Sequence, residues 1–527
     1  MPAQAGRASK GARLRKEAGA LLYIHAPVHL ALGTSMSPAI LFSVVLAYFL
    51  ILLGVAWRTS RHATNDSFFI GNKDSNWMLV AFGMVGTTLT GVTFISVPGA
   101  VGRDGFGYVQ LMIGYVLGYL AITFILLPLY YRLQLTSIYR YLELRLGRRS
   151  YQSGSAFFIL SRLLGATARL YLVVNILQAT ILDSFGVPFW ATAAAVLLLI
   201  LLYTYEGGVK TIVWTDTLQT ACMLAGLVIC SVFLLREMDM SVLDSLERMR
   251  SQGLARVFTL DPDSPAYVWK HIVAGMFITV AMTGMDQEMM QKNISVRTLR
   301  DSQKNMLSLT VVLTGVLLLF LFLGGLLHLY APLAGVTATG DKLFPAVVLG
   351  HFPAIVQLIF FIALISALFP SVDGALTALT STFCIDILGL QRRAGLDAAA
   401  QMRWRRRVHL GFAALFLVLI MAFKWIDSPS MIGVILKLAS YTYGPLLGLF
   451  AFGLISRRGV RNRWVPLVAV AGPLLCALIE QEQALLFAHY RIGLELLILN
   501  GALVLAGLFL ISTPAEKGGA QLPKHDH

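Results

Sequence analysis

The sequence predicts an all-α polytopic membrane protein, and three observations support this prediction. Of the 527 residues, 57% are hydrophobic and only 13% are charged, a balance that soluble globular proteins do not show. The mean hydropathy is +0.73. Apolar runs of about 20 residues, the length that crosses the hydrocarbon core as a helix, recur along the chain. We therefore expect about thirteen transmembrane helices.

We place the expected spans near residues 36–56, 77–100, 109–130, 154–182, 187–205, 212–235, 271–290, 305–330, 354–387, 409–424, 431–455, 464–480 and 491–512. The ninth segment is too long for one straight crossing, so we expect its last turns to lie near the cytoplasmic surface. All the cysteines fall inside these spans without metal-ligand spacing, which indicates packing residues: Cys222, Cys230, Cys384 and Cys476.

Lys and Arg residues predict the orientation of the chain. They concentrate in one set of alternate loops, which includes clusters at 132–149, 292–304, 392–407 and 457–463. By the positive-inside rule, these loops and the C-terminus face the cytoplasm, and the first span begins outside. The net charge of +15 is therefore attributed to loops that face anionic lipid, not to nucleic acid. We expect a multi-pass protein of the inner (plasma) membrane with an extracytoplasmic N-terminus.

We also make predictions for three segments outside the spans. Residues 1–35 carry basic residues that would lie outside, and no clean apolar core with a cleavage site follows them, so we interpret them as an upstream extension or a disordered tail. The loop 237–270 has apolar residues at helical spacing between 240 and 249, which predicts an amphipathic surface helix. Residues 513–527 are expected to form a short cytoplasmic tail.

The second span is a poor sequence for a continuous helix. Residues 83–93 contain three glycines and four threonines, and both residue types lower helix propensity. Carbonyl groups freed at mid-membrane depth are tolerated only where protein or a water-lined cavity satisfies them, and transporters use such breaks to coordinate Na⁺. We predict a helix break here; packing of small residues between helices is the alternative.

The ninth span has a second polar interruption. Pro370 removes a helical hydrogen bond and frees a carbonyl, while Ser371, Asp373 and Thr377 add oxygen atoms beside it. A carboxylate within a membrane span marks an ion or substrate pathway by default, and oxygen ligands suit hard cations. Hydroxyl groups that bond back to their own helix would explain the threonines but not Asp373.

Other charged residues lie within the spans as well. Asp216 stands just inside the sixth span, with no nearby cation in the sequence. Arg162 and Arg169 in the fourth span are seven residues apart and therefore share one helical face. A membrane arginine can hold a carboxylate of the substrate bidentately, or it can form a structural ion pair with Asp216 or Asp373.

Three stretches of the chain resemble the sodium:solute symporter family, which includes proline, glucose, iodide and sialic acid carriers. They are Gly207–Lys210 with Trp214–Gln219, then Asp286–Lys292, and the second-span motif through Pro98-Gly99-Ala100. The resemblance covers roughly residues 36–512. It implies a LeuT-like fold of two inverted five-helix repeats with broken core helices, here at residues 77–235 and 271–455.

The resemblance also implies the positions of sodium ligands. One sodium ion would be held at positions matching Gly86, Leu89, Ala367, Pro370 and Ser371. Many relatives have a pair of hydroxyl residues where this chain has Pro370-Ser371, so one side-chain ligand is missing here. A second sodium or coupling site would use positions matching Asp216, Asp373 and Gly374.

Substrate contacts in the family come from the broken helix just past the sodium ligands. The matching residues, together with other polar positions that we expect to face the solute, are Thr88, Thr90, Thr93, Gln110, Arg169 and Gln287. These groups suit a small polar solute, such as a sugar, an amino acid, an organic acid or a similar anion, and the sequence does not choose among them.

The expected function is therefore uptake of a small solute driven by inward movement of Na⁺, by alternating access, in a monomeric protein in the lipid bilayer. No cofactor besides Na⁺ as the coupling ion is expected. A passive channel is one alternative, but it would place a polar stripe along several helices. A membrane sensor with a symporter-like fold is another. An enzyme is not expected, because no nucleophile–base pair or metal motif is present and the histidines are scattered at span ends.

Overall fold

The computed structural model describes residues 37–59, 75–392, 397–425, 431–487 and 490–514. The expected extension at 1–35 and nearly all of the tail at 513–527 lie outside these residues. In the first half the helices are α2 (Pro38–Thr59), α4 (Trp77–Thr88), α5 (Gly91–Asp104), α6 (Tyr108–Ala121), α7 (Leu127–Arg132), α8 (Arg140–Leu146), α9 (Arg148–Leu177), α10 (Phe189–Glu237) and α11 (Val242–Ser251).

The second half continues the helical pattern. Its helices are α12 (Val268–Thr279), α13 (Gln287–Ile294), α14 (Leu299–Leu333), α15 (Leu343–His351), α16 (Ala354–Thr382), α17 (Ala398–Phe423), α18 (Met431–Thr442), α19 (Gly444–Ile455), α20 (Val465–Gln481), α21 (Gln483–Phe487) and α22 (Leu496–Leu510). Two short strands, β1 (Gly459–Val460) and β2 (Ser512–Thr513), pair antiparallel near the end of the described chain.

The described residues contain eight helices that are long and apolar enough to span a membrane, or up to eleven spans if each of three bent helix pairs counts as one. Two shorter apolar helices, Phe189–Tyr205 and Leu496–Leu510, coincide with the fifth and last expected spans. The all-α polytopic class is therefore confirmed. The number thirteen and the inverted repeat stay predictions.

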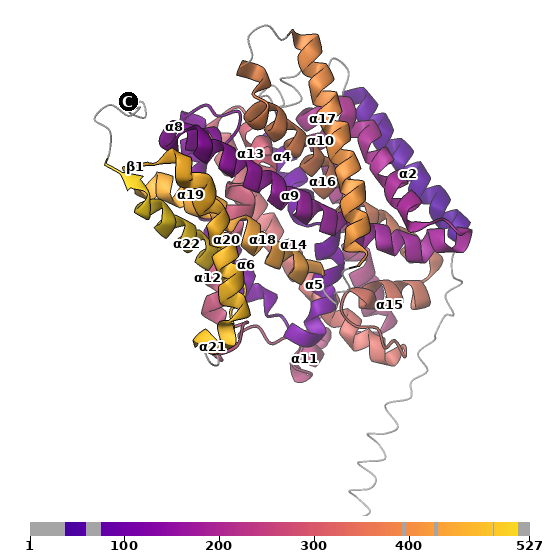
Figure 1. Ribbon diagram of the computed structural model, residues 1–527. Helices are drawn as coiled ribbons and strands as arrows, with labels where there is room; N and C mark the ends of the chain where they lie inside the picture. Colours follow the sequence, from indigo (N-terminus) through magenta and orange to yellow (C-terminus); the bar gives the residue numbers. More distant parts are fainter. Residues whose placement is uncertain (1–36, 60–74, 393–396, 426–430, 488–489, 515–527) are drawn as a thin grey trace, which may run out of the picture.

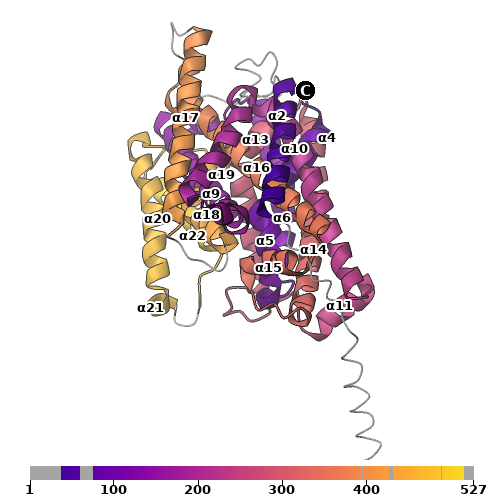
Figure 2. The ribbon, with the colours of Figure 1, turned by 90° about the vertical axis from the view of Figure 1, so that its right-hand side faces the viewer.

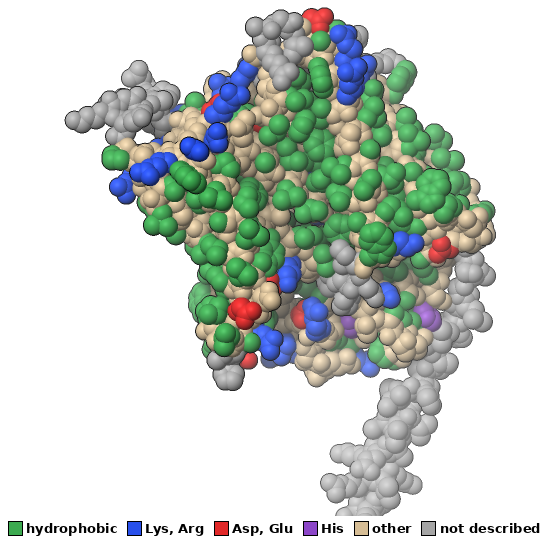
Figure 3. Space-filling view, in the orientation of Figure 1, with side chains coloured by type: hydrophobic (Ala, Val, Ile, Leu, Met, Phe, Trp, Pro, Cys, Tyr) green, Lys and Arg blue, Asp and Glu red, His purple; other side chains and the backbone are tan. Residues whose placement is uncertain are grey.

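The surface of the molecule separates apolar flanks from charged ends. Figure 3 shows hydrophobic side chains over the flanks and Lys and Arg side chains at both ends, including the end that carries α8, β1 and the start of α17. Large side chains such as Val311, Val418 and Leu467 are more than half exposed, as expected where lipid covers the protein. The end that carries α8 and β1 is the one that the positive-inside rule assigns to the cytoplasm.

The predicted break in the second span is present. Helices α4 and α5 meet at a bend of 56°, and between them Leu89 and Thr90 leave the helical conformation. The last carbonyl groups of a helix have no partner within it, so this break supplies backbone oxygens in the middle of the molecule. Helix α5 packs on α9, α14 and α16.

The predicted break in the ninth span is wrong. Helix α16 continues from Ala354 to Thr382 with Pro370 inside it. A single proline costs a membrane helix one hydrogen bond, and the tight packing around it, chiefly by α10, holds the helix in place.

The second sharp break lies instead at the end of α12, where a π-helical turn ends at Gly284 and α13 starts after Asp286, with a bend of 64°. Asp286 caps α13 by accepting hydrogen bonds from the backbone N–H groups of Glu288 and Met289. A third bend of 45° separates α18 from α19.

The structure confirms the expected surface helix in the loop 237–270 but not the expected loop between the fifth and sixth spans. The surface helix in the loop 237–270 is present as α11, which begins at a capping box formed by Ser241 and Asp244 and buries Met249. The expected loop between the fifth and sixth spans is helical, because α10 runs through residues 206–211. The structure does not describe the surroundings of Gly207 and Gly208 or the side chain of Lys210. These residues belong to the first stretch that carries the resemblance.

The last helices of the chain form a group of their own. Figures 1 and 2 show α19, α20 and α22 together on one flank, away from α2 and α10. Helix α10 packs along α16, α4 and α2, and α22 packs on α19 and α20. Of the broken helices, α4 packs on α10 and α14, and α5 packs on α9 and α18.

Candidate functional site

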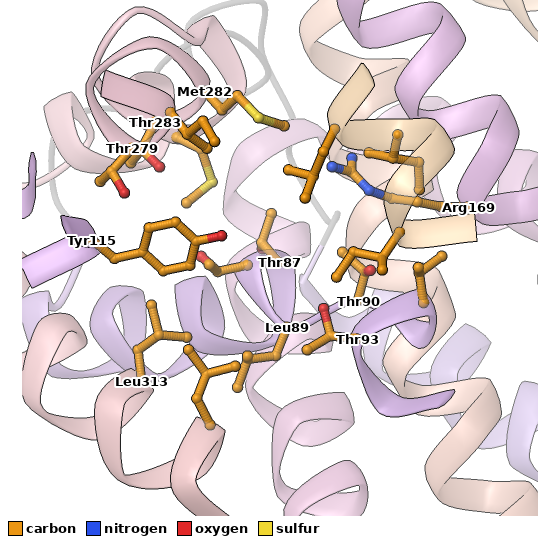
Figure 4. Close-up of a pocket in the computed structure, with 18 of the residues that line it drawn as sticks. Thr87, Leu89, Thr90, Thr93, Tyr115, Arg169, Thr279, Met282, Thr283 and Leu313 are labelled. Atoms are coloured by element: carbon orange, nitrogen blue, oxygen red, sulfur yellow. The ribbon is translucent and has the colours of Figure 1, made fainter. Parts of the chain in front are cut away.

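A cavity of about 120 Å³ opens beside the break between α4 and α5. Its walls come from α4, α5, α6, α9, α12, α14 and α18, and Figure 4 shows its lining side chains. Polar groups from the break face it: Thr87, Thr88, Thr90 and Thr93. The other polar contributors include Tyr115, Thr279 and Thr283, while Leu313, Leu317 and Ile435 supply apolar surface. The cavity is thus a small, mixed pocket at a helix break.

Two arginines on one face of α9 have different surroundings. Arg162 is buried and forms an ion pair with Glu288, and its Nη1 lies 3.8 Å from Oδ2 of Asp286. Arg169 is half-buried and lines the cavity, where Figure 4 shows its guanidinium pointing inward. Within the described chain, Arg169 has no hydrogen bond or ion pair. The alternative of an ion pair between Arg169 and Asp216 or Asp373 is therefore not what the structure has.

Two glutamines expected to contact substrate lie elsewhere. The amide of Gln110 donates to the carbonyls of Gly107 and Ala266 and accepts from the N–H of Thr259. The amide of Gln287 accepts from the N–H of Ile138 and donates to the carbonyl of Thr136. Both side chains hold backbone segments together, and neither lines the cavity. We correct both assignments, because a buried amide with satisfied partners is a structural group.

The predicted first sodium ligands meet where α4, α10 and α16 touch. A Cβ atom at Gly86 would lie 2.2 Å from Oγ1 of Thr220 and 3.6 Å from Cγ of Pro370, so the backbone of α4 comes very close to both helices. Ala367, Pro370 and Ser371 share one face of α16 by their three- and four-residue spacing. The hydroxyls of Ser371 and Thr220 are buried and have no hydrogen-bond partner among the residues that the structure describes.

These unpaired oxygens fit a cation. Buried hydroxyl groups are normally hydrogen-bonded, and the end of α4 adds carbonyl oxygens without helical partners. Thr220 was not identified from the sequence. Its position one helical turn after Asp216 on the same helix is the signal that could have suggested it.

The predicted second site contains an ammonium group. Nζ of Lys292 lies 2.7 Å from Oδ2 of Asp216 and 2.7 Å from Oγ1 of Thr87, and 3.6 Å from Oε1 of Glu288. Asp373 is bonded differently: the hydroxyl of Tyr203 donates to its Oδ2 at 2.9 Å and the N–H of Gly374 to its Oδ1 at 2.5 Å. All these charged side chains are almost fully buried.

Sequence reasoning missed the roles of Lys292 and Glu288. Both stand in the stretch Asp286–Lys292, which carries part of the resemblance to the family. Lys292 was assigned to a basic cytoplasmic loop, but its side chain is buried. Their spacing of four residues places them on one face of a helix. However, the partners Asp216 and Arg162 are distant in the sequence, so only the fold brings these charges together.

Comparison with known proteins identifies the family of this chain. Residues 68–462 match the model of the sodium:solute symporter family. The chain belongs to this family. The relatives found are transporters, in agreement with the expectation that the protein is not an enzyme, and Na⁺ is the coupling ion of the family.

Curated relatives of this family show modest identity. The chain is 28% identical over 235 residues to the human sodium/iodide cotransporter, a match of 44% of this chain and 36% of that protein. It is 26% identical to the bovine sodium-coupled monocarboxylate transporter 2, over 79% of this chain and 68% of the relative. The sodium/sialic acid symporter of Proteus mirabilis is 23% identical, over 86% of this chain and 89% of the relative.

Solved structures show the same fold. The substrate-bound outward-open state of a Na⁺-coupled sialic acid symporter superposes with a TM-score of 0.77, at 18% identity, covering 91% of this chain and 99% of that one. A nucleobase-cation-symport-1 family transporter in a closed conformation gives a TM-score of 0.52 at 13% identity, covering 85% and 94%. The LeuT-like fold expected from the sequence is thus confirmed.

Proposed function

We propose that this protein takes up a small monocarboxylate anion, driven by the inward movement of Na⁺. The observation that carries the proposal is the unpaired guanidinium of Arg169, which faces the cavity at the helix break. A charge in a partly desolvated site is costly unless an opposite charge pairs with it. Arg169 therefore favours an anionic solute over a neutral sugar.

The chemistry of the cavity favours a carboxylate in particular. A guanidinium presents a planar set of N–H donors that matches the two oxygens of a carboxylate. Threonine hydroxyls from the break, among them Thr90 and Thr93, lie around the same space and can hydrogen-bond further oxygens of the solute. The apolar side chains Leu313 and Ile435 suit a short hydrocarbon portion.

The size of the cavity limits the solute. Liquid water takes about 30 Å³ per molecule, and an engineered cavity of about 150 Å³ binds benzene. A cavity of about 120 Å³ therefore suits a solute of about four to six heavy atoms. Three relatives carry names of anionic solutes, namely iodide, a monocarboxylate and sialic acid, which supports an anion here. The small volume favours the short monocarboxylate.

Sodium would bind at the contact of α4 and α16. The carbonyls of Gly86, Leu89, Ala367 and Pro370 and the hydroxyl of Ser371 are the groups that would hold it, and Thr220 adds a further hydroxyl. The residues between Gly86 and Leu89 include Thr87 and Thr88, which line the cavity. Because one short segment serves both sites, an ion that orders this segment also orders the wall of the solute site, and the coupling is reciprocal.

The remaining expectations complete the proposal. We infer a monomer in the plasma membrane with a cytoplasmic C-terminus and an extracytoplasmic N-terminus. The basic clusters at 132–149 and 457–463 belong to the loops of α8 and β1, and β1 pairs with β2 close to the last described residue, which supports this orientation.

Uptake into proteoliposomes tests the proposal. Radiolabelled short-chain monocarboxylates, a neutral sugar and a neutral amino acid are compared, with an inward Na⁺ gradient and with choline in place of Na⁺. We expect concentrative, Na⁺-dependent uptake of the monocarboxylate alone. Uptake that only equilibrates the solute would support the passive channel, and preferred uptake of the neutral solutes would contradict the role of Arg169.

A further inference from the structure

The cluster around Asp216 differs from an ion site that opens to solution. Nζ of Lys292 contacts oxygens from three helices, namely Asp216 on α10, Thr87 on α4 and Glu288 on α13. The exposed fraction of the three charged side chains is 3% or less. An ammonium group has three N–H donors and no acceptor. Two of these donors make hydrogen bonds of 2.7 Å, to Asp216 and Thr87. Oε1 of Glu288 lies 3.6 Å from Nζ.

This arrangement resembles the coordination of a monovalent cation. Lys292 brings one positive charge to a shell of carboxylate and hydroxyl oxygens, which are the ligands that Na⁺ uses. The charge is attached to the chain, so its presence does not depend on the concentration of any ion. A second cation bound to the same carboxylate would stand within a few ångströms of the ammonium and be repelled in a region of low dielectric constant.

The neighbouring groups leave little for a second ion. The oxygens of Asp373 accept hydrogen bonds from Tyr203 and from the backbone of Gly374. A Cβ atom at Gly374 would lie 2.2 Å from Oε1 of Glu288, so α13 packs directly against α16 at this level. Among the described residues, the oxygens of this cluster that are buried without a hydrogen-bond partner are Oδ1 of Asp216 and Oε1 of Glu288, and Oε1 already lies 3.6 Å from Nζ of Lys292.

We propose that the ammonium group of Lys292 is a built-in cation that replaces a second sodium ion at Asp216, so that one Na⁺ accompanies each solute. The proposal rests on the sodium coupling proposed above and specifies its stoichiometry. Because Thr87 joins this cluster to the segment that holds the predicted sodium ligand Gly86, the fixed charge also helps to orient the wall of the cavity.

Binding of ²²Na⁺ to purified protein in detergent tests the proposal without transport. The wild-type protein is expected to bind one Na⁺ per chain with a Hill coefficient near one. Lys292→Gln removes the charge and leaves Asp216 to a second ion, so we expect two Na⁺ per chain and a Hill coefficient that rises toward two. Lys292→Arg keeps the charge and should stay at one. Adding Asp216→Asn to Lys292→Gln should return the number to one.

Each outcome has a distinct meaning. Two Na⁺ bound by the wild-type protein would overturn the inference and leave the proposed function standing. No Na⁺ bound by the wild-type protein would contradict the proposed function itself. A folded Lys292→Gln variant, judged by a monodisperse gel-filtration peak, that still binds only one Na⁺ would also overturn the inference.

A second measurement needs no variant. One Na⁺ moving with one monocarboxylate carries no net charge, whereas two Na⁺ carry one positive charge. Uptake into wild-type proteoliposomes should therefore be unaffected by a K⁺ diffusion potential set with valinomycin. Uptake that an inside-negative potential accelerates severalfold would contradict the single-ion stoichiometry.

Discussion

The two predicted cation sites are close in sequence and opposite in character. At the first, the hydroxyls of Ser371 and Thr220 are buried with no donor to satisfy them. At the second, Asp216 is paired with an ammonium from the chain itself. Buried oxygens without partners cost free energy that a bound ion can recover, while a paired carboxylate has already gained its counter-charge. The difference indicates that acidic charge alone does not identify an ion site, because the chain itself can supply the counter-charge.

The largest expected effect is loss of stability when the pair at Asp216 is broken. Asp216→Asn leaves the Lys292 ammonium buried without its main partner, which should lower the free energy of unfolding by about 3–5 kcal/mol. Thermal unfolding in detergent measures the change. The double variant Asp216→Asn, Lys292→Met should recover most of the loss, because no buried charge then remains unpaired. A double variant as unstable as Asp216→Asn would show that the ion pair is not the cause.

The next effect concerns the first site. Ser371→Ala removes a buried oxygen ligand, so the apparent affinity for Na⁺ should fall by about five- to a hundredfold, corresponding to about 1–3 kcal/mol. The Na⁺ dependence of ²²Na⁺ binding measures it. Ser231→Ala is the matched control, since that buried serine only bonds back to the carbonyl of Leu227. Equal Na⁺ curves for Ser371→Ala and the control would place the sodium ligands elsewhere.

The cavity offers a similar contrast between a paired and an unpaired arginine. Arg169→Lys keeps the charge but loses the planar pair of donors, so affinity for a monocarboxylate should fall by about tenfold, or about 1.4 kcal/mol. Competition of unlabelled solute against uptake measures it, and Na⁺ binding without solute should not change. Arg162→Lys, in contrast, should act mainly on stability, because Arg162 is paired with Glu288 and Asp286.

The smallest effect is expected at an ion pair outside the spans. Arg392 on the surface makes a bidentate contact with Glu143, and its hydrogen bonds lower the pKa of Glu143 from the usual 4.5. A lowered pKa means that the pairing stabilises the protein above pH 4.5 and that this contribution disappears as the pH falls through the folded-state pKa. Because both groups are partly exposed, the contribution should be about 0.2–1 kcal/mol.

Unfolding of Arg392→Gln at several pH values tests this pair. The variant should be slightly less stable than the wild type at pH 7 and indistinguishable from it near pH 3. A loss of several kcal/mol at pH 7 would mean that a surface pair is as important as the buried one at Asp216, and the contrast between the two sites would fail.

The sequence by itself determined the membrane class and a helix break within residues 83–93, because hydropathy and helix propensity act over neighbouring residues. It also singled out Asp216, Arg169 and Ser371 as candidate site residues. It did not find that α16 runs through Pro370, or that Gln110 and Gln287 bond to backbone.

The tertiary structure decided which charges meet. Lys292 and Asp216 are 76 residues apart, and Glu288 and Arg162 are 126 apart. Neighbouring residues in the sequence do not predict such pairs. The pairs form only when α13, α10 and α9 pack against the broken pair α4 and α5. The same packing leaves Arg169 and Ser371 without partners, and a missing partner can be seen only after every neighbour has been placed.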